Sequence, residues 1–114
     1  MSVPNMFRPE FDERREHPGF ECRRARLGRQ AGSVKTGLSL WELPPGEAAY
    51  PYHFHLAEEE TIVVVRGRLH LRTPDRWREL EEGDVVCFPP GEAGAHQVVN
   101  RGDEPVRFLA FSNQ

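Results

Sequence analysis

The sequence predicts a single all-β domain of antiparallel strands. From Thr36 onward, short apolar runs are separated by turns rich in proline and glycine, a pattern typical of a β-sandwich or barrel. No window of about 11 residues keeps a helical period with good helix formers. At 114 residues the chain is long enough for one compact domain and too short for two ordinary ones.

Residues 1–30 differ in texture from the rest of the chain. They are polar, with scattered phenylalanines and prolines, and no strand or helical period holds there. We therefore expect an irregular N-terminal arm over residues 1–30, followed by one β domain over residues 31–114. Because the edges of an open sheet need protection, we expect the arm to cover a neighbour's edge and the protein to be a homodimer.

The strands of the β domain can be placed in chain order from the apolar runs. The expected strands are Leu38–Leu43, Tyr50–His55, Thr61–Val65, Leu69–Leu71, Trp77–Leu80, Val85–Phe88, His96–Val99 and Val106–Phe111. Proline, glycine, asparagine or aspartate occupies the turns between them, which supports these ends. We expect Gly46, Gly67, Gly83 and Gly91 to serve turns that need positive φ or a close backbone approach. Asn100 is expected to hold a turn through hydrogen bonds to the backbone.

The charge balance argues against a nucleic-acid or membrane-surface protein. The chain has 15 basic and 18 acidic residues and a net charge of -3. A short segment concentrates four arginines, namely Arg23, Arg24, Arg26 and Arg29. We interpret it as a solvated strand face or turn that the preceding acidic residues neutralise, with an anion-binding patch as the alternative.

The lengths of the apolar stretches and the number of cysteines indicate the cellular compartment and the state of the thiols. The longest uninterrupted aliphatic stretch, Ile62 to Val65, is far short of the roughly 20 residues that span a bilayer. The N-terminus has no apolar run of signal-peptide length, so we expect a cytoplasmic protein. Cys22 and Cys87 are too few for a disulfide framework. Both are expected to be reduced, and Cys87 is expected in the core.

Histidines and a carboxylate form the candidate site. His53 and His55 lie two positions apart, so on a strand both project from one face. A glutamate follows on the next strand, and His96 is the candidate third imidazole. Alternation places Glu60 on the face of Ile62 and Val64, which favours it over Glu59 as a ligand, although Glu59 remains open.

The spacing of these residues resembles the two sequence motifs of the cupin superfamily. The first motif is matched by Gly46, His53, His55, Glu60 and Gly67, and the second by Gly83, Pro89, Gly91, His96 and Asn100. The chain departs from the usual spacing by one extra residue between Gly46 and His53. It also has two extra residues between Gly91 and His96, which lengthen the turn before His96.

The resemblance implies a small single-domain bacterial cupin with a jelly-roll β-barrel of antiparallel strands. By position it implies a divalent metal held by His53, His55, Glu60 and His96. Three imidazoles and one carboxylate suit Fe, Mn, Ni, Co, Cu or Zn, and the native metal is left open.

Two interpretations of the function remain open at this point. The first is a metal-dependent oxidoreductase of dioxygenase type, decarboxylase or isomerase that acts on a small oxygenated molecule, with Glu60 as a candidate base. The second is a non-catalytic module that uses the metal to bind or sense a small molecule. An enzyme requires an open coordination position and a polar side chain near it, whereas a structural metal site is closed.

Overall fold

The computed structural model of the protein describes residues 1–113. Its strands are β1 (Glu13–Arg15), β2 (Cys22–Ala25), β3 (Thr36–Leu43), β4 (Glu60–Arg66), β5 (Leu69–Arg72), β6 (Trp77–Leu80), β7 (Val85–Phe88), β8 (Gln97–Val99) and β9 (Val106–Asn113). A five-residue helix, α1 (Leu27–Ala31), and a 3₁₀ turn, η1 (Glu92–Gly94), complete the elements described.

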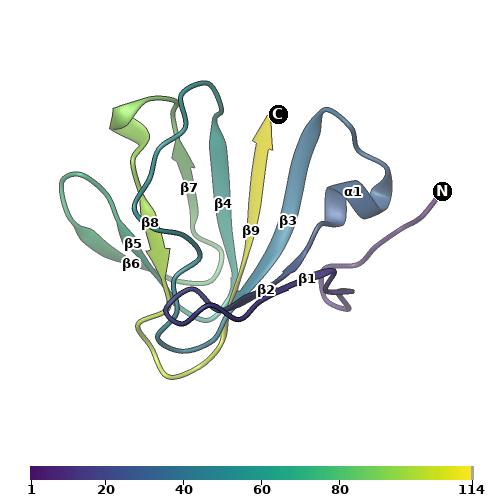
Figure 1. Cartoon of the computed structure of the whole chain (residues 1–114), viewed down its shortest axis with the longest axis horizontal. Coiled ribbons are helices and arrows are strands. Elements are labelled where there is room, and N and C mark those ends of the chain that lie inside the picture. Colours follow the sequence, from purple (N-terminus) through teal and green to yellow (C-terminus); the bar gives the residue numbers. More distant parts are fainter. Residues whose placement is uncertain (114) are drawn as a thin grey trace.

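The strands form two antiparallel sheets that face each other (Figure 1). One sheet has six strands in the order β1-β2-β3-β9-β4-β7, and the other has three in the order β6-β5-β8. The prediction of an all-β antiparallel fold is confirmed. The two ladders are not joined into one continuous hydrogen-bonded barrel, so the jelly roll is a double-sheet arrangement.

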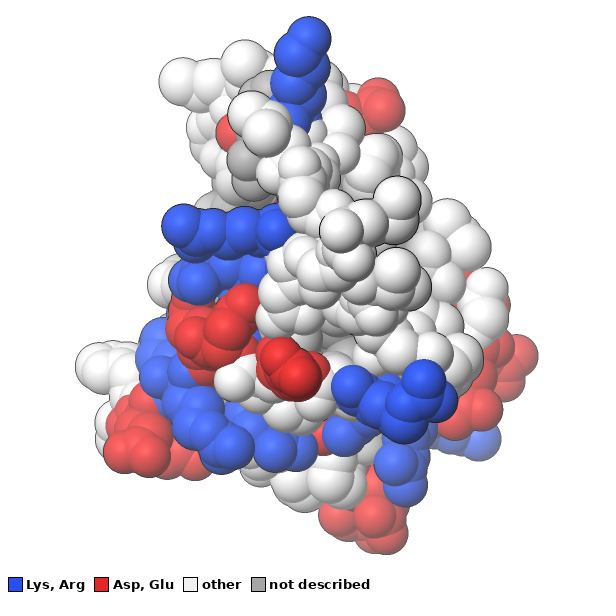
Figure 2. Space-filling model, turned by 90° about the vertical axis from the view of Figure 1, so that its right-hand side faces the viewer, with Lys and Arg blue, Asp and Glu red and all other residues white. Residues whose placement is uncertain are grey.

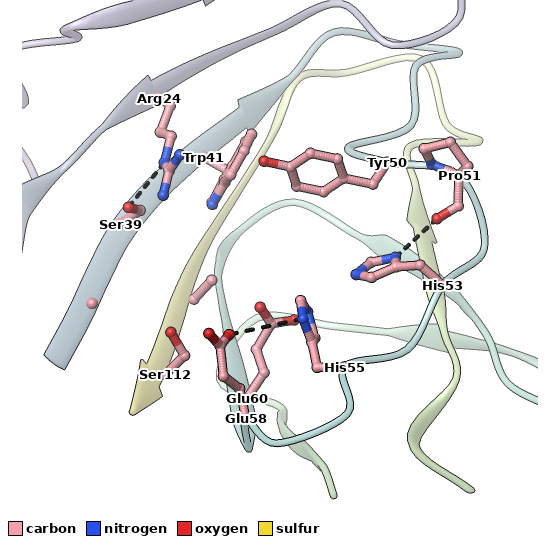
Figure 3. Close-up of a pocket in the computed structure, with 12 residues that line it drawn as sticks. Arg24, Ser39, Trp41, Tyr50, Pro51, His53, His55, Glu58, Glu60 and Ser112 are labelled. Atoms are coloured by element: carbon pink, nitrogen blue, oxygen red, sulfur yellow. Dashed lines mark hydrogen bonds and ion pairs between the residues drawn. The ribbon is translucent and has the colours of Figure 1, made fainter. Parts of the chain in front are cut away.

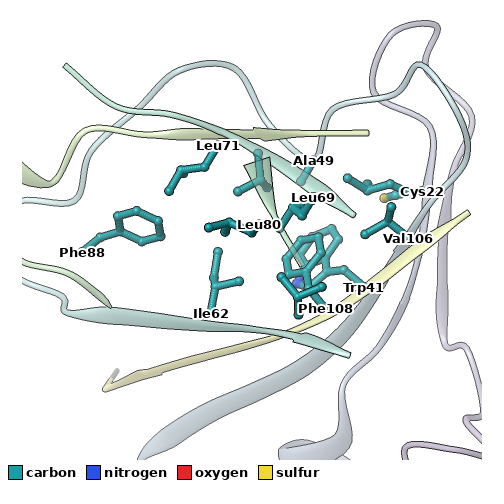
Figure 4. Close-up of a cluster of buried hydrophobic side chains, with 13 residues drawn as sticks. Cys22, Trp41, Ala49, Ile62, Leu69, Leu71, Leu80, Phe88, Val106 and Phe108 are labelled. Carbon is teal, nitrogen blue, oxygen red and sulfur yellow. The ribbon is translucent and has the colours of Figure 1, made fainter. Parts of the chain in front are cut away.

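Apolar side chains from both sheets meet between them (Figure 4). Ile62 and Val64 alternate along β4 and are both buried, as the period of a half-buried strand requires. Opposite them, Leu69 and Leu71 of β5 are buried in the same cluster. Burying each such side chain stabilises the fold by roughly 1.5–3 kcal/mol, so this core fixes the distance between the two sheets.

The N-terminal region is more regular than the sequence predicted. Strand β1 pairs with β2, and β2 pairs with β3, so both belong to the six-stranded sheet. The prediction of an irregular arm over residues 1–30 is therefore wrong from Glu13 onward. These strands are too short for their period to be visible in the sequence, and β2 is held by pairing with β3 and by burial of its two end residues, Cys22 and Ala25.

Phe11 packs against the outer face of its own six-stranded sheet. It contacts a second buried cluster centred on Ala25, Leu27 and Leu40. The arm thus covers part of this chain's own sheet. The homodimer expected from the sequence stays a prediction.

Two further expectations differ from the structure. Tyr50–His55 is not a strand but part of an irregular loop, tied down by one isolated bridge between His53 and His96. Pro51 has no N–H to give to a ladder, which disfavours a strand there. Cys87 is exposed and not in the core, because Val86 and Phe88 are the residues of β7 that point inward.

Charged side chains of both signs are interspersed on the face that carries the N-terminal strands (Figure 2). Arg23 pairs with Glu42 at 2.5 Å, and Arg26 pairs with Glu13. These contacts agree with a solvated, neutralised face for most of the arginine cluster. Among residues 1–113, no helix is long and apolar enough to cross a membrane.

Candidate functional site

Two loops that are distant in the sequence pair through their backbones and bring His53 and His96 side by side. The N–H of His53 donates to the carbonyl of His96 at 3.0 Å, and the N–H of His96 donates back to the carbonyl of His53 at 2.8 Å. Their ring centroids lie 4.7 Å apart, and the ring of His55 lies 5.0 Å from that of His53. The structure thus gathers the three predicted imidazoles.

Glu60 is the carboxylate that faces these rings. It is the first residue of β4, and its Oε1 lies 3.0 Å from Nε2 of His96. The neighbouring Glu59 is exposed, and its backbone N–H donates to the side chain of Asn113. The alternation argument therefore chose the glutamate that the structure places beside His96.

Two backbone carbonyls fix which nitrogen of each ring carries hydrogen. Nδ1 of His53 lies 2.9 Å from the carbonyl of Pro51, and Nδ1 of His96 lies 2.8 Å from the carbonyl of Gly94. A carbonyl oxygen can only accept, so Nδ1 is the donor in both rings. The Nε2 atoms are left as the nitrogens available to a metal, the usual arrangement for a metal-binding histidine.

This assignment creates an unusual pair at the centre of the site. In a neutral His96, Nε2 is an acceptor, and it faces Glu60 Oε1, which is also an acceptor. Two acceptors 3.0 Å apart require a proton or a cation between them. His96 is only 2 % exposed, so water does not readily separate the two groups.

Burial and neighbouring charge set the ionisation of this group of residues. Burial lowers the pKa of His53, and the nearby His96 and His55 lower it further. Burial by itself would raise the pKa of Glu60, but a hydrogen bond donated by His96 when its Nε2 carries a proton, together with the positive charge of protonated imidazoles, outweighs burial and brings this pKa below its ordinary value. A deprotonated carboxylate and neutral His53 are the forms that bind metal ions.

The imidazole nitrogens and the carboxylate fit a divalent transition metal, although these side chains are not all oriented toward one common point. Within residues 1–113, no three His, Cys, Asp or Glu side chains are already placed as a formed metal site. The rings of His53 and His55 are perpendicular, and those of His53 and His96 are inclined by 52°. The four-residue ligand set is therefore kept as a proposal.

A cavity of about 530 Å³ opens beside these residues (Figure 3). At one end it is lined by His53, His55, Glu58 and Glu60. The remaining lining residues are Arg24, Gly37, Ser39, Trp41, Tyr50, Pro51, Ala110 and Ser112.

Several of these lining residues were not expected from the sequence. Tyr50 lines the cavity and is 39 % exposed. Ser39 and Ser112 occupy positions of β3 and β9 whose neighbours two residues along, Trp41 and Ala110, also line the cavity. A polar residue at an inward-facing strand position was the available signal.

Comparison with known proteins adds a family and several relatives. The cupin domain family matches residues 39–112. A glucose-6-phosphate isomerase from Pyrococcus horikoshii is 42% identical over 114 aligned residues, which cover 90% of this chain and 58% of the relative. The chain thus spans little more than half the length of that protein.

Solved structures give the same relationship. The sugar phosphate isomerase of the cupin superfamily from Silicibacter pomeroyi superposes with a TM-score of 0.85 at 28% identity, covering 97% of this chain and 74% of that one. A protein from Thermotoga maritima described as "a predicted oxalate decarboxylase" superposes with a TM-score of 0.71 at 25% identity, covering 82% of this chain and 80% of that one. These similarities confirm the expected jelly-roll fold.

Proposed function

The chain belongs to the cupin domain family, and on that premise we propose that it is a metal-dependent isomerase of a small sugar phosphate. The proposed ligands of the divalent metal are His53, His55, Glu60 and His96. The observation that carries the proposal is the contact of buried His96 Nε2 with half-buried Glu60 Oε1 at 3.0 Å, because two acceptors at this distance are best reconciled by a shared cation.

The choice of isomerisation is supported by the named relatives. Both the glucose-6-phosphate isomerase and the sugar phosphate isomerase cover more of this chain than the protein described as an oxalate decarboxylase. Interconversion of an aldose and a ketose moves hydrogen between two adjacent carbon atoms. The site must then hold a carbonyl and a neighbouring hydroxyl, and it must provide a group that carries a proton.

A bound metal ion would act as a Lewis acid that polarises the substrate carbonyl. Glu58 is the cavity carboxylate outside the ligand set, and its Oε2 lies 3.8 Å from Nδ1 of His55. We assign to Glu58 the role of taking and returning the proton. Glu60 is less suited to that role because its carboxylate is engaged by His96.

The aromatic side chains beside the site orient both ligands and substrate. Tyr50 meets the ring of His53 edge to face, with centroids 5.7 Å apart, and it meets Trp41 in the same way at 5.3 Å. This row of rings walls the cavity between its two ends (Figure 3). Such a wall restricts the orientations of a bound sugar and limits the access of water.

Metal analysis tests the first half of the proposal. Protein purified anaerobically should contain close to one divalent metal ion per chain, and His53→Ala and His96→Ala should lose most of it. Removing a hydrogen-bond partner of a metal ligand typically costs about 10–100-fold in metal affinity, so removing a ligand itself should cost at least roughly that much. His17→Ala and Glu59→Gln are the matched controls. Unchanged metal content in both ligand variants would remove the metal site.

Turnover tests the second half. Metal-loaded protein should interconvert glucose 6-phosphate and fructose 6-phosphate or a shorter pair of sugar phosphates, measured by NMR of the equilibrating sugars. Glu58→Gln should lower the turnover rate by roughly 100-fold or more, while the metal content stays at the wild-type level. Metal-loaded protein that binds these sugars without converting any of them would instead establish the non-catalytic binding function.

A further inference from the structure

The cavity has two chemically different ends. Carboxylates from Glu58 and Glu60 lie among the histidines, whereas the opposite end carries the guanidinium of Arg24 beside Ser39 (Figure 3). Within residues 1–113, Arg24 is the one Lys or Arg that lines this cavity. We propose that Arg24 and Ser39 form a subsite for an anionic group at the far end of the substrate, which rests on the proposed function for the metal end.

Arg24 is held in place from two sides. Its Nε donates to Oγ of Ser39 at 3.0 Å, and Ser39 is itself only 5 % exposed. Its guanidinium carbon lies 4.7 Å from the ring centroid of Trp41, its direct partner across β2 and β3. Stacking on an aromatic face and a hydrogen bond to a buried hydroxyl preorganise the guanidinium. The terminal nitrogens remain able to bind an anion bidentately.

The positive charge of Arg24 is only partly neutralised within the protein. Glu13 lies 3.7 Å from Nη1 of Arg24, but the same carboxylate oxygen makes a much closer contact with Arg26. Arg26 also has a second carboxylate, that of Asp12, at 3.8 Å. Among the residues that the structure describes, Arg24 keeps only the long contact with Glu13, and its guanidinium faces a cavity in which burial on one side weakens screening by water.

The charges of the two ends favour one direction of the ligand. An anionic group is attracted by Arg24, whereas at the other end the carboxylates of Glu58 and Glu60 offset the charge of the proposed metal ion. The neutral, oxygen-rich end of the same molecule is then left for the histidine end. Gly37 has no side chain and Ser112 has a small one, so the wall between the ends leaves room for the body of the molecule.

Two ligand chemistries share the required anionic oxygens. A phosphate and a carboxylate both accept paired hydrogen bonds from a guanidinium. A matched series separates them, because glucose 6-phosphate, glucuronate and glucose differ at one position of the same sugar. The subsite predicts that both charged members bind better than glucose, and the stronger of the two identifies the class of anion.

The fluorescence of Trp41, which lies under Arg24, reports binding directly. The other tryptophan, Trp77, lies in the distant β6 strand and is replaced in a Trp77→Phe background. In that background, glucose 6-phosphate or glucuronate should change the emission saturably at constant ionic strength. Arg24→Gln should weaken this binding by roughly tenfold or more. Arg29→Gln, which removes an exposed arginine of the same segment, should leave it within about twofold.

Titrations of metal-free and metal-loaded protein distinguish this inference from the proposed function. Arg24 is not a proposed ligand, so the charged sugars should remain preferred over glucose after the metal is removed, and Arg24→Gln should keep the wild-type metal content and melting temperature. Loss of the metal site in the His96→Ala test would leave the anion preference intact. The inference is overturned if wild-type protein binds neither charged sugar, if it binds glucose equally well, or if Arg24→Gln binds the charged sugars as wild type does.

Discussion

The phenyl ring of Phe88 lies flat against the imidazole of His96, with centroids 3.6 Å apart and planes inclined by 8°. Phe88 is the inward-pointing residue at the end of β7, and it is 6 % exposed. One face of the imidazole is thereby fixed by a side chain from the six-stranded sheet, while its Nδ1 is fixed by the carbonyl of Gly94. The orientation of His96 is a property of the packed core.

Phe88→Ala should lower the free energy of unfolding by about 3–5 kcal/mol, because it opens a cavity against a buried ring. The measurement is urea denaturation followed by circular dichroism. Val85→Ala on the same strand is the control, since Val85 is 61 % exposed and its loss should change stability by no more than about 0.5 kcal/mol. Equal effects of the two substitutions would contradict the packing of Phe88 on His96.

Glu42 should contribute stability that depends on pH. It accepts hydrogen bonds from Arg23 and Arg107, both at 2.8 Å. Burial by itself would raise the pKa of Glu42, but these two arginines outweigh burial and hold the pKa below its ordinary value of 4.5. The folded protein thus releases this proton at a lower pH than the unfolded chain. The stabilisation is fully present above the ordinary value and is lost as the pH falls through the lower, folded-state pKa.

Glu42→Gln should therefore cost about 1–3 kcal/mol of unfolding free energy at pH 7, and the difference from wild type should shrink as the pH falls below 4.5. Denaturant titrations over a range of pH values measure it. Glu79→Gln breaks the exposed pair with Arg68 and should cost no more than about 0.5 kcal/mol. A difference for Glu42→Gln that is constant down to the lowest pH would show that its carboxylate charge is not responsible.

Asn100 should be the costliest polar residue to truncate. It is fully buried, and its amide donates to the carbonyls of Leu43 and Glu104 while its oxygen accepts from the N–H of Gly102. Asn100→Ala leaves these backbone groups without partners, which should cost about 2–4 kcal/mol. Thermal unfolding measures this loss. Asn113→Ala, at an exposed asparagine, should shift the melting temperature little. A similar shift for both variants would refute the stabilising role of the hydrogen bonds of Asn100.

Gly94→Ala should disturb the turn that presents His96. A Cβ at Gly94 would lie 1.9 Å from the carbonyl oxygen of Pro89, a distance that the backbone cannot accommodate without moving. The expected result is a loss of about 2 kcal/mol or more of stability together with a shifted NMR signal of the His96 ring. Gly102→Ala is the control, because its Cβ would make only an ordinary contact at 3.5 Å. An unchanged His96 signal in Gly94→Ala would contradict this role.

The predictions that succeeded from the sequence rest on strong local signals. Gly67 has φ of 83° and a Cβ there would meet the carbonyl of Pro105 at 3.0 Å, so its turn requires glycine. Asn100 holds its turn as expected. Alternation along β4 favoured Glu60 over Glu59, and the structure places Glu60 beside His96, while its role as a metal ligand stays a proposal. In each case the structure follows from the chemistry of one residue or from the two-residue period of a strand, both of which can be recognised in the sequence.

The predictions that failed depend on long-range pairing. Strand β1 has three residues, too few to show a period, and it exists because β2 lies beside it. Cys87 sits in an apolar run, but the run does not reveal which face is buried. Arg24 was interpreted as part of a solvated face, and only the register with Trp41 places it at the cavity. Such information lies in the relation between distant segments.

Because residues 50–55 form an irregular loop, the proposed metal ligands are held by two different kinds of structure. Glu60 is anchored by strand pairing and His96 by the ring of Phe88. His53 and His55 instead lie in an irregular loop that is held by the bridge to His96 and by the hydrogen bond from the N–H of Gly91 to the carbonyl of His55. Exchanges in that loop can reshape the entrance without breaking the ladder between β3 and β9. Substitutions of a few residues at the cavity entrance can therefore change which substrate is bound while both sheets stay intact.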